Sequence, residues 1–89
     1  MLESKIEAYL VRRIKQLGGM AEKFTSPGRR SVPDRLVTLQ NGRIVFVELK
    51  APGKRPTDNQ KRDHERRIAL GCEVLVIDTL EGVDNAFPR

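Results

Sequence analysis

The 89-residue chain carries 17 Lys and Arg against 12 Asp and Glu, so its formal net charge is +5. A chain of this size buries about 60 to 65% of the surface that its unfolded form exposes, which leaves room for one domain and excludes a large enclosed cofactor cavity. Aromatic residues make up only 4% of the chain, which also excludes the exposed aromatic platforms of an OB-fold or RRM.

The first part of the chain has apolar residues at the spacing of one helical face, so we predict a helix over residues 2–17. Gly18 and Gly19 follow it, as is common where a helix ends in a left-handed residue. Met20–Thr25 is predicted to be a short strand, and residues 26–31 form a polar loop.

The middle of the chain has the pattern of a β-hairpin. Predicted strands over 35–39 and 43–50 flank the turn segment 40–42, which reads Gln-Asn-Gly. The run Ile44–Val47 is apolar at every position, which predicts a central strand covered on both faces.

The last part of the chain begins with a helix start signal. Thr57 and Gln60 have the spacing of a capping box, so we predict a second helix over about 58–70. Val74–Ile77 is predicted to be a final buried strand, and residues 79–89 a short acidic tail. The predicted order α-β-β-β-α-β indicates one α/β domain over the whole chain, with a mixed sheet flanked by helices.

Cysteine and histidine content limits the metal chemistry. Cys72 is the only cysteine, so it can form neither an intramolecular disulfide nor a thiolate metal cluster, and we expect it to be a small packed residue. His64 is the only histidine, which excludes zinc fingers and HExxH peptidases. Any bound metal would therefore be held by oxygen. No apolar run approaches the roughly 18 residues of a membrane span, and no secretory signal follows Met1, so we expect a cytoplasmic protein.

The positive charge is concentrated in the middle of the chain, around two loops. Basic side chains that neutralise phosphates gain affinity by releasing counterions, so the pattern favours nucleic acid as the partner. A merely solvated basic surface is the alternative interpretation. The residues that we expect to contact DNA phosphates are Lys23, Arg29, Arg30 and Arg35 in the first stretch, and Lys54 and Arg55 in the second.

A small set of residues carries the chemistry: Pro33-Asp34, and then Glu48-Leu49-Lys50 fourteen positions after Asp34. Glu48 and Lys50 point to the same face of their strand, because strand side chains alternate. A carboxylate at the end of an apolar strand costs several kcal/mol unless it is paired or binds a metal. Lys50 and a cation are the two candidate partners of Glu48, and a structural salt bridge is the alternative to a site.

The hairpin register decides if Asp34 can meet Glu48. A two-residue turn at Asn41-Gly42 would place Asp34 opposite Leu49, on the wrong face. A three-residue loop with Gly42 in the left-handed conformation places Asp34 opposite Glu48. Two opposed carboxylates repel each other unless a divalent cation lies between them, so we predict the three-residue loop. Oxygen ligands of this kind suit Mg²⁺ or Mn²⁺, with Lys50 placed to orient an attacking water.

These residues resemble the PD-(D/E)xK nuclease superfamily, and within it the VRR-NUC family (virus-type replication-repair nucleases). The likeness covers nearly the whole chain: a Glu and a final glycine in the first helix, the basic loop entering Val32–Val37, the strand Phe46–Lys50, Gln60, and Gly71 before a Val-rich strand. One departure is Ser31, where the family has a small Gly.

The resemblance implies a restriction-endonuclease-like core and a nuclease activity. It implies that Asp34 and Glu48 bind a divalent metal, that the backbone carbonyl of Leu49 is a further ligand, that Lys50 is catalytic, and that Gln60 supports the site. Gln60 can also be only the second half of the capping box.

The first helix offers two acids one turn apart, Glu3 and Glu7. Archaeal Holliday junction resolvases, which the chain also resembles, have a helix acid about eleven residues before the helix-ending glycine. Glu7 lies eleven positions before Gly18, so we favour Glu7 as the catalytic and metal-binding acid. We expect His64 to be a surface helix residue rather than a general base.

Together these inferences predict a Mg²⁺- or Mn²⁺-dependent endonuclease for branched DNA, such as four-way (Holliday) junctions, of the kind that phages use in DNA repair. A junction is two-fold symmetric and needs two cuts, so a chain of 89 residues would act as a homodimer. A duplex- or flap-cutting nuclease of the same fold and a non-catalytic DNA-binding module are the alternatives.

Overall fold

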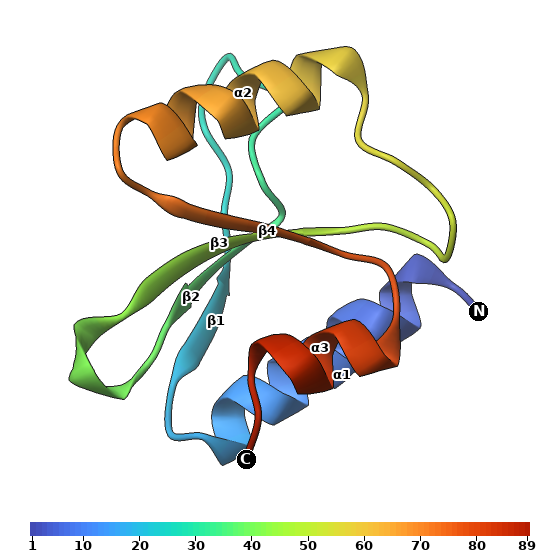
Figure 1. Ribbon diagram of the computed structural model, residues 1–89, viewed down its shortest axis with the longest axis vertical. Coiled ribbons are helices and arrows are strands. Elements are labelled where there is room, and N and C mark those ends of the chain that lie inside the picture. The colour runs from blue at the N-terminus through green and yellow to red at the C-terminus, as the bar shows by residue number, and fades with distance from the viewer.

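Four strands form one mixed sheet in the order β1-β2-β3-β4 in the computed structural model, which describes residues 1–89 (Figure 1). The antiparallel part comprises β1 (Met20–Lys23), β2 (Arg35–Thr38) and β3 (Ile44–Leu49), and β4 (Glu73–Ile77) pairs with β3 in parallel. The parallel pairing requires a crossover, which the helix α2 (Asp58–Ala69) provides. The predicted mixed sheet is confirmed.

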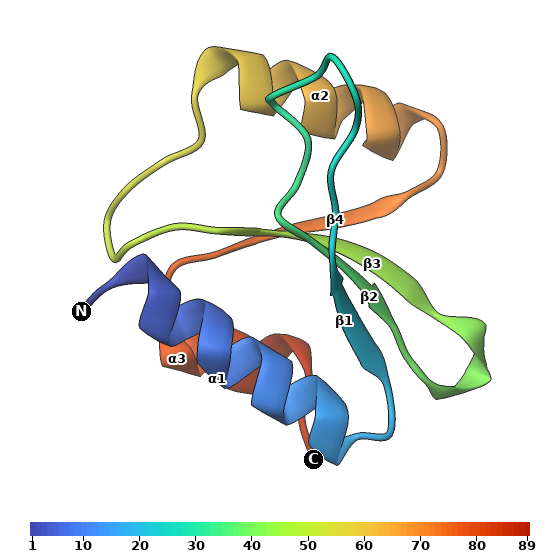
Figure 2. The same cartoon turned by 180° about the vertical axis from the view of Figure 1, so that it is seen from behind.

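Helices cover both sides of this sheet. The helices α1 (Glu3–Gln16) and α3 (Leu80–Ala86) lie together on one side, and α2 lies on the other (Figures 1 and 2). The longest helix, α1, has 14 residues, so no helix of this chain could cross a bilayer. The loop that joins β1 to β2 extends away from α1 and α3 and passes beside α2 (Figure 2).

The apolar core lies between the sheet and the α1–α3 pair. Alternate residues of β3 point into it, as the period of a strand requires, and residues of α1 at helical spacing face them. The ten buried members are Ile6, Leu10, Ile14, Val37, Val45, Val47, Leu49, Ile77, Val83 and Phe87.

The α2 side of the sheet is held by polar and aromatic contacts instead. The only buried residues of α2 are Asp63 and His64. Phe46 of β3 packs edge to face on Phe24, with ring centroids 5.3 Å apart, and the Arg67 guanidinium lies 4.7 Å from the Phe46 ring centre. Side chains with charged ends and apolar or planar stems thus fill this layer.

Two expectations from the sequence were wrong here. The segment predicted as an acidic tail forms α3, which is capped by the Thr79 hydroxyl accepting a hydrogen bond from Gly82 N–H at 2.8 Å, and which buries Val83 and Phe87. The final strand is not fully buried, because β4 is an edge strand and Val76 keeps 45% of its surface exposed. The predicted helices over 2–17 and 58–70 are otherwise confirmed to within one or two residues.

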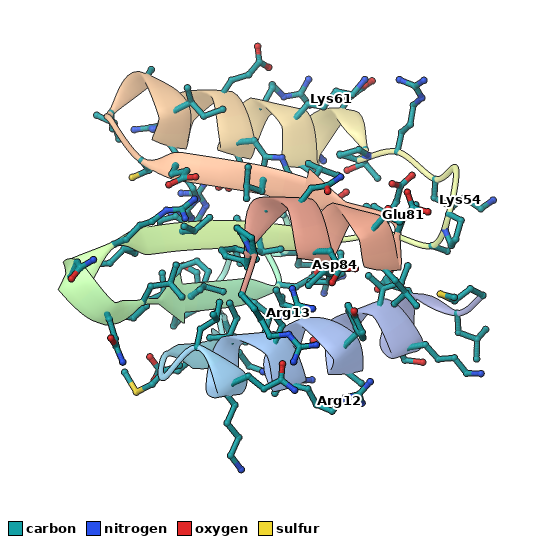
Figure 3. All side chains as sticks on the ribbon, turned by 60° about the horizontal axis from the view of Figure 1, so that its bottom comes forward. Arg12, Arg13, Lys54, Lys61, Glu81 and Asp84 are labelled. Atoms are coloured by element: carbon teal, nitrogen blue, oxygen red, sulfur yellow. The ribbon has the colours of Figure 1, made fainter.

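A buried arginine fastens α3 to α1. Arg13 donates hydrogen bonds to the Asp84 carboxylate at 2.6 Å and to the Phe87 carbonyl at 2.8 Å, and Tyr9 donates to the same carboxylate at 2.8 Å. Figure 3 shows Arg13 and Asp84 meeting between the two helices. The hydrogen bond from Tyr9 lowers the pKa of Asp84, so this acid stays ionised beside the guanidinium. The acid expected in a solvated tail is therefore a structural ion-pair partner.

Candidate active site

The β2–β3 hairpin brings Asp34 and Glu48 to the same level of the sheet. Its register pairs Arg35 with Val47, so the next positions, Asp34 and Glu48, are opposite each other. Three residues form the loop, closed by the hydrogen bond from Leu39 N–H to the Arg43 carbonyl at 2.8 Å. Both Asn41 (φ 77°) and Gly42 (φ 78°) are left-handed, which confirms the predicted loop and its parity.

Glu48 is a buried carboxylate whose surroundings disfavour its ionised form. Only 2% of its surface is exposed. Burial raises its pKa to about 8, the negative charge of Asp34 adds to the rise, and Lys50 opposes it. Asp34 is held in place because its Oδ2 accepts a hydrogen bond from Leu49 N–H at 2.8 Å. The two acids therefore lie together at the end of the central strand. Ionising both of them at once costs free energy, because their negative charges repel each other in a buried place.

Two polar side chains contact Glu48 Oε2. Lys50 Nζ lies 3.6 Å away and Gln60 Nε2 donates a hydrogen bond at 3.3 Å. Gln60 also completes the capping box: its Oε1 accepts from Thr57 N–H at 2.9 Å, and its N–H donates to Thr57 Oγ1 at 3.2 Å. The sequence allowed Gln60 a cap role alone or a cap role together with a site role, and the structure shows both contacts in one side chain. Its amide is fixed at one end by the cap, which orients the other end toward Glu48.

His64 faces the second oxygen of Glu48, and the prediction of a surface residue was wrong. The His64 side chain is 8% exposed, and its Nε2 lies 3.7 Å from Glu48 Oε1. Neither atom has a hydrogen-bond partner. Burial lowers the His64 pKa, which favours a neutral imidazole. The available sequence signal was its spacing, one helical turn after Gln60 and hence on the same face of α2.

The donor set fits a divalent cation at Asp34 and Glu48. Glu48 Oε1 is buried without a hydrogen bond, next to a second carboxylate, and both groups are the hard oxygen ligands that Mg²⁺ or Mn²⁺ prefers. No group of three or more His, Cys, Asp or Glu side chains is close enough to hold a metal ion. The side chains therefore offer a pair of carboxylates, beside the Leu49 carbonyl that the sequence resemblance adds.

Glu7 is not brought into that pair. Its Oε2 accepts a hydrogen bond from Arg35 Nε at 2.8 Å, and Arg35 also donates to the Ala21 carbonyl at 2.8 Å. Glu7 does line, with Glu3 and Asp34, a cavity of about 540 Å³ between α1 and the β1–β2 loop. It thus faces the site through this cavity while its carboxylate is paired with Arg35.

The basic residues predicted to contact DNA are in three different situations. Arg35 is only 15% exposed and is occupied by Glu7, so the structure does not place it on the surface. Arg29 pairs with Asp63 of α2 at 2.9 Å. The remaining four are exposed, two at the mouth of the cavity and two on the β3–α2 loop, where Figure 3 shows Lys54: Lys23, Arg30, Lys54 and Arg55.

The fold and these residues define a class of protein. A PD-(D/E)xK-type nuclease has a mixed sheet with an acid before its second strand. It also has an acid and a lysine two residues apart at the end of the central strand, and a glutamine on the crossover helix. This chain has all of these features.

Comparison with known proteins identifies the family. The chain is 57% identical over 77 residues to "Putative nuclease p44" of Acyrthosiphon pisum secondary endosymbiont phage 1, and the alignment covers 86% of this chain and 83% of that protein. A solved structure described as a "VRR_NUC domain" superposes with a TM-score of 0.89 at 37% identity, covering 93% of this chain and 90% of the other. No protein-family profile matches the sequence. The chain belongs to the VRR-NUC family of nucleases.

Proposed function

We propose that the protein is a Mg²⁺- or Mn²⁺-dependent endonuclease that hydrolyses phosphodiester bonds in DNA, with four-way junctions as its preferred substrate. The observation that carries the proposal is the buried Glu48 beside Asp34, with one carboxylate oxygen unpartnered. A divalent cation held there would lower the pKa of a water molecule and stabilise negative charge on the phosphate.

The chain's own residues have separate roles in this reaction. Asp34 and Glu48 would hold the cation, with the Leu49 carbonyl as the further ligand that the family resemblance adds. The resemblance also adds Glu7, which would have to leave its pair with Arg35 to join them. Lys50, 3.6 Å from Glu48 Oε2, orients the attacking water or offsets the charge that develops on the phosphate. Gln60 and His64 flank the two oxygens of Glu48 and fix its rotamer. Lys23, Arg30, Lys54 and Arg55 contact backbone phosphates and position the substrate without reading its sequence.

The preference for a branched substrate rests on size and symmetry. One chain of 89 residues covers a short stretch of DNA, whereas a two-fold symmetric junction needs two cuts, so the active form is a homodimer with two sites. Because the relative of known source is a phage protein, we place the reaction in the cytoplasm of the cell that the phage infects.

A substrate panel tests the proposal. The protein is incubated with labelled four-way junction, flap, duplex and single-stranded DNA, with Mg²⁺, Mn²⁺ or EDTA, beside Asp34→Asn, Lys50→Ala and the control Lys61→Ala. The Lys61 side chain is exposed on α2 and forms no salt bridge. We expect symmetric cleavage of the junction with metal only, abolished in the two site variants, whose DNA binding remains, and kept in the control.

Three outcomes would contradict parts of the proposal. If duplex or flap DNA is cut faster than the junction, that DNA and not the junction is the preferred substrate. Cleavage in EDTA would show that the reaction needs no divalent metal. Binding without any cleavage under either metal would leave a DNA-binding module in place of an enzyme.

A further inference from the structure

A second cavity, separate from the one that Asp34 lines, lies between the β1–β2 loop and α2. Its volume is about 310 Å³, and no apolar side chain lines it. Four of its residues are arginines, two from the loop and two from the helix: Arg29, Arg30, Arg62 and Arg66. Asn59 and Asp63 of α2 and Ser31 of the loop complete the wall. We call this cavity the arginine pocket.

The sequence of α2 builds one side of the arginine pocket. Asn59, Arg62, Asp63 and Arg66 are three or four positions apart, so they share one face of the helix. Figure 2 shows the β1–β2 loop passing alongside this helix. The pocket therefore depends on the loop staying against α2.

Asp63 holds the loop there. Its side chain is 3% exposed, and its Oδ1 accepts a hydrogen bond from Arg29 of the loop at 2.9 Å. Its Oδ2 accepts another from Arg67 at 2.8 Å. Two guanidinium groups thus share the one carboxylate of the pocket, and its negative charge is already compensated.

The other three arginines of the pocket have no acidic partner. Arg30, Arg62 and Arg66 form no salt bridge anywhere in the chain, and Arg62 donates only to the Asn59 side-chain oxygen. Like charges that line one small cavity repel one another, and a bound anion removes that cost. Guanidinium groups match phosphate oxygens in bidentate pairs, so phosphate is the anion that this donor set fits.

The arginine pocket adjoins the candidate active site. Arg29 and Arg30 line both this pocket and the cavity that contains Asp34. A DNA strand with one phosphate at the carboxylates would therefore carry a neighbouring phosphate past Arg30 and onto α2. We propose that the arginine pocket binds a non-scissile backbone phosphate of the DNA strand that is cut, and so fixes the position of the scissile bond. The proposal rests on the nuclease function proposed above.

A binding experiment without metal tests the pocket independently of cleavage. The affinity for labelled DNA is measured in EDTA by fluorescence anisotropy over a range of salt concentrations, for the wild type and for Arg62→Ala/Arg66→Ala. The matched control is Arg12→Ala/Lys61→Ala, which removes the same charge from exposed positions outside the pocket, one on α1 and one on α2 (Figure 3). Circular dichroism and thermal unfolding check that both variants are folded.

The expected result is a loss confined to the pocket variant. The pocket variant loses its contact with one phosphate, so the steepness of log K against log salt should fall by about 0.9, and affinity at moderate salt should fall roughly tenfold. Arg62→Lys/Arg66→Lys should keep the charge but lose part of the affinity, because lysine lacks the bidentate fork. Equal weakening in the pocket variant and the matched control would overturn the proposal.

A single neutral phosphate locates the contact. DNA with one methylphosphonate linkage, moved along the strand, should bind the wild type about tenfold more weakly at one position near the cleavage point, and Arg62→Ala/Arg66→Ala should lose that sensitivity. Sensitivity that persists in the variant refutes the pocket. A protein that shows the positional effect and cuts no DNA refutes the nuclease function instead, so the two failures are distinguishable.

Discussion

Replacing Glu48 by Gln should stabilise the protein while abolishing cleavage. The carboxylate is buried, and the structure raises its pKa from 4.5 to about 8. The folded state therefore holds a proton that the unfolded state has released, so folding stability falls as the pH rises between these two values. Each pH unit in this window costs about 1.4 kcal/mol, which gives about 3 kcal/mol at pH 7. A neutral amide removes this cost and leaves an oxygen to accept from Gln60.

Urea unfolding followed by circular dichroism, at several pH values from 5 to 8, measures the effect. We expect the two proteins to differ little at pH 5, and the variant to gain about 2 to 3 kcal/mol relative to the wild type by pH 7. His64 has the opposite pH dependence. Burial lowers its pKa, so its contribution to folding stability falls as the pH drops below the usual value of 6.5. It is present in both proteins, so the part of its contribution that does not depend on Glu48 cancels in the difference between them.

Divalent metal provides the second arm of the same experiment. A cation that binds the folded wild type stabilises it by mass action, about 2.7 kcal/mol at a concentration one hundred times the dissociation constant. Mg²⁺ or Mn²⁺ should therefore recover for the wild type the stability that Glu48→Gln has without metal, and should affect the variant much less. A wild type whose stability does not fall relative to the variant between pH 5 and pH 7 would refute the reasoning.

Four further substitutions test contacts that the structure shows. Gln60→Ala should lower both stability, by about 1 kcal/mol, and cleavage, whereas Thr57→Ala, which removes a cap partner and leaves Glu48 untouched, should lower stability alone; thermal unfolding and a cleavage assay decide this. Asp84→Ala leaves the buried Arg13 guanidinium without an acidic partner and should lower the urea midpoint of unfolding, by less than the loss of a fully buried pair would because Asp84 is 45% exposed. Gly19→Ala would place a Cβ 2.5 Å from a backbone oxygen of β2, so we expect a loss above about 1 kcal/mol and a lower melting temperature; an unchanged melting temperature would contradict the close approach.

Local sequence signals reduced the frame that holds the two candidate acids, Asp34 and Glu48, to two alternatives. The segment Gln40-Asn41-Gly42 allowed a two-residue or a three-residue turn, and we chose the three-residue turn because it lets Asp34 meet Glu48 around a cation. The structure has that turn, and strand alternation then places Asp34 opposite Glu48. The capping box at Thr57 likewise places the start of α2. These features depend on residues close together in the sequence.

Features that depend on distant partners were not predicted. The helix α3 is short and weakly apolar, and it is stabilised by packing of Phe87 into the core and by the Asp84 contact with Arg13 of α1. His64 stands in a charged stretch of sequence, and its burial follows from the way α2 lies over Glu48. Tertiary contacts decide such cases, because a residue's own neighbours in sequence do not describe what will cover it.

The two helical layers are held to the sheet by different kinds of contact. One layer rests on ten buried apolar side chains, whereas α2 is attached through Asp63, His64 and arginine–aromatic contacts. The α2 layer buries little apolar surface, so we expect α2 to open locally before the apolar layer does, with its amide protons exchanging ahead of those of the sheet. Gln60, His64 and half of the arginine pocket would leave with it, while Asp34 and Glu48 stay on the sheet. The local opening of α2 would then set how much of the population carries an assembled candidate site.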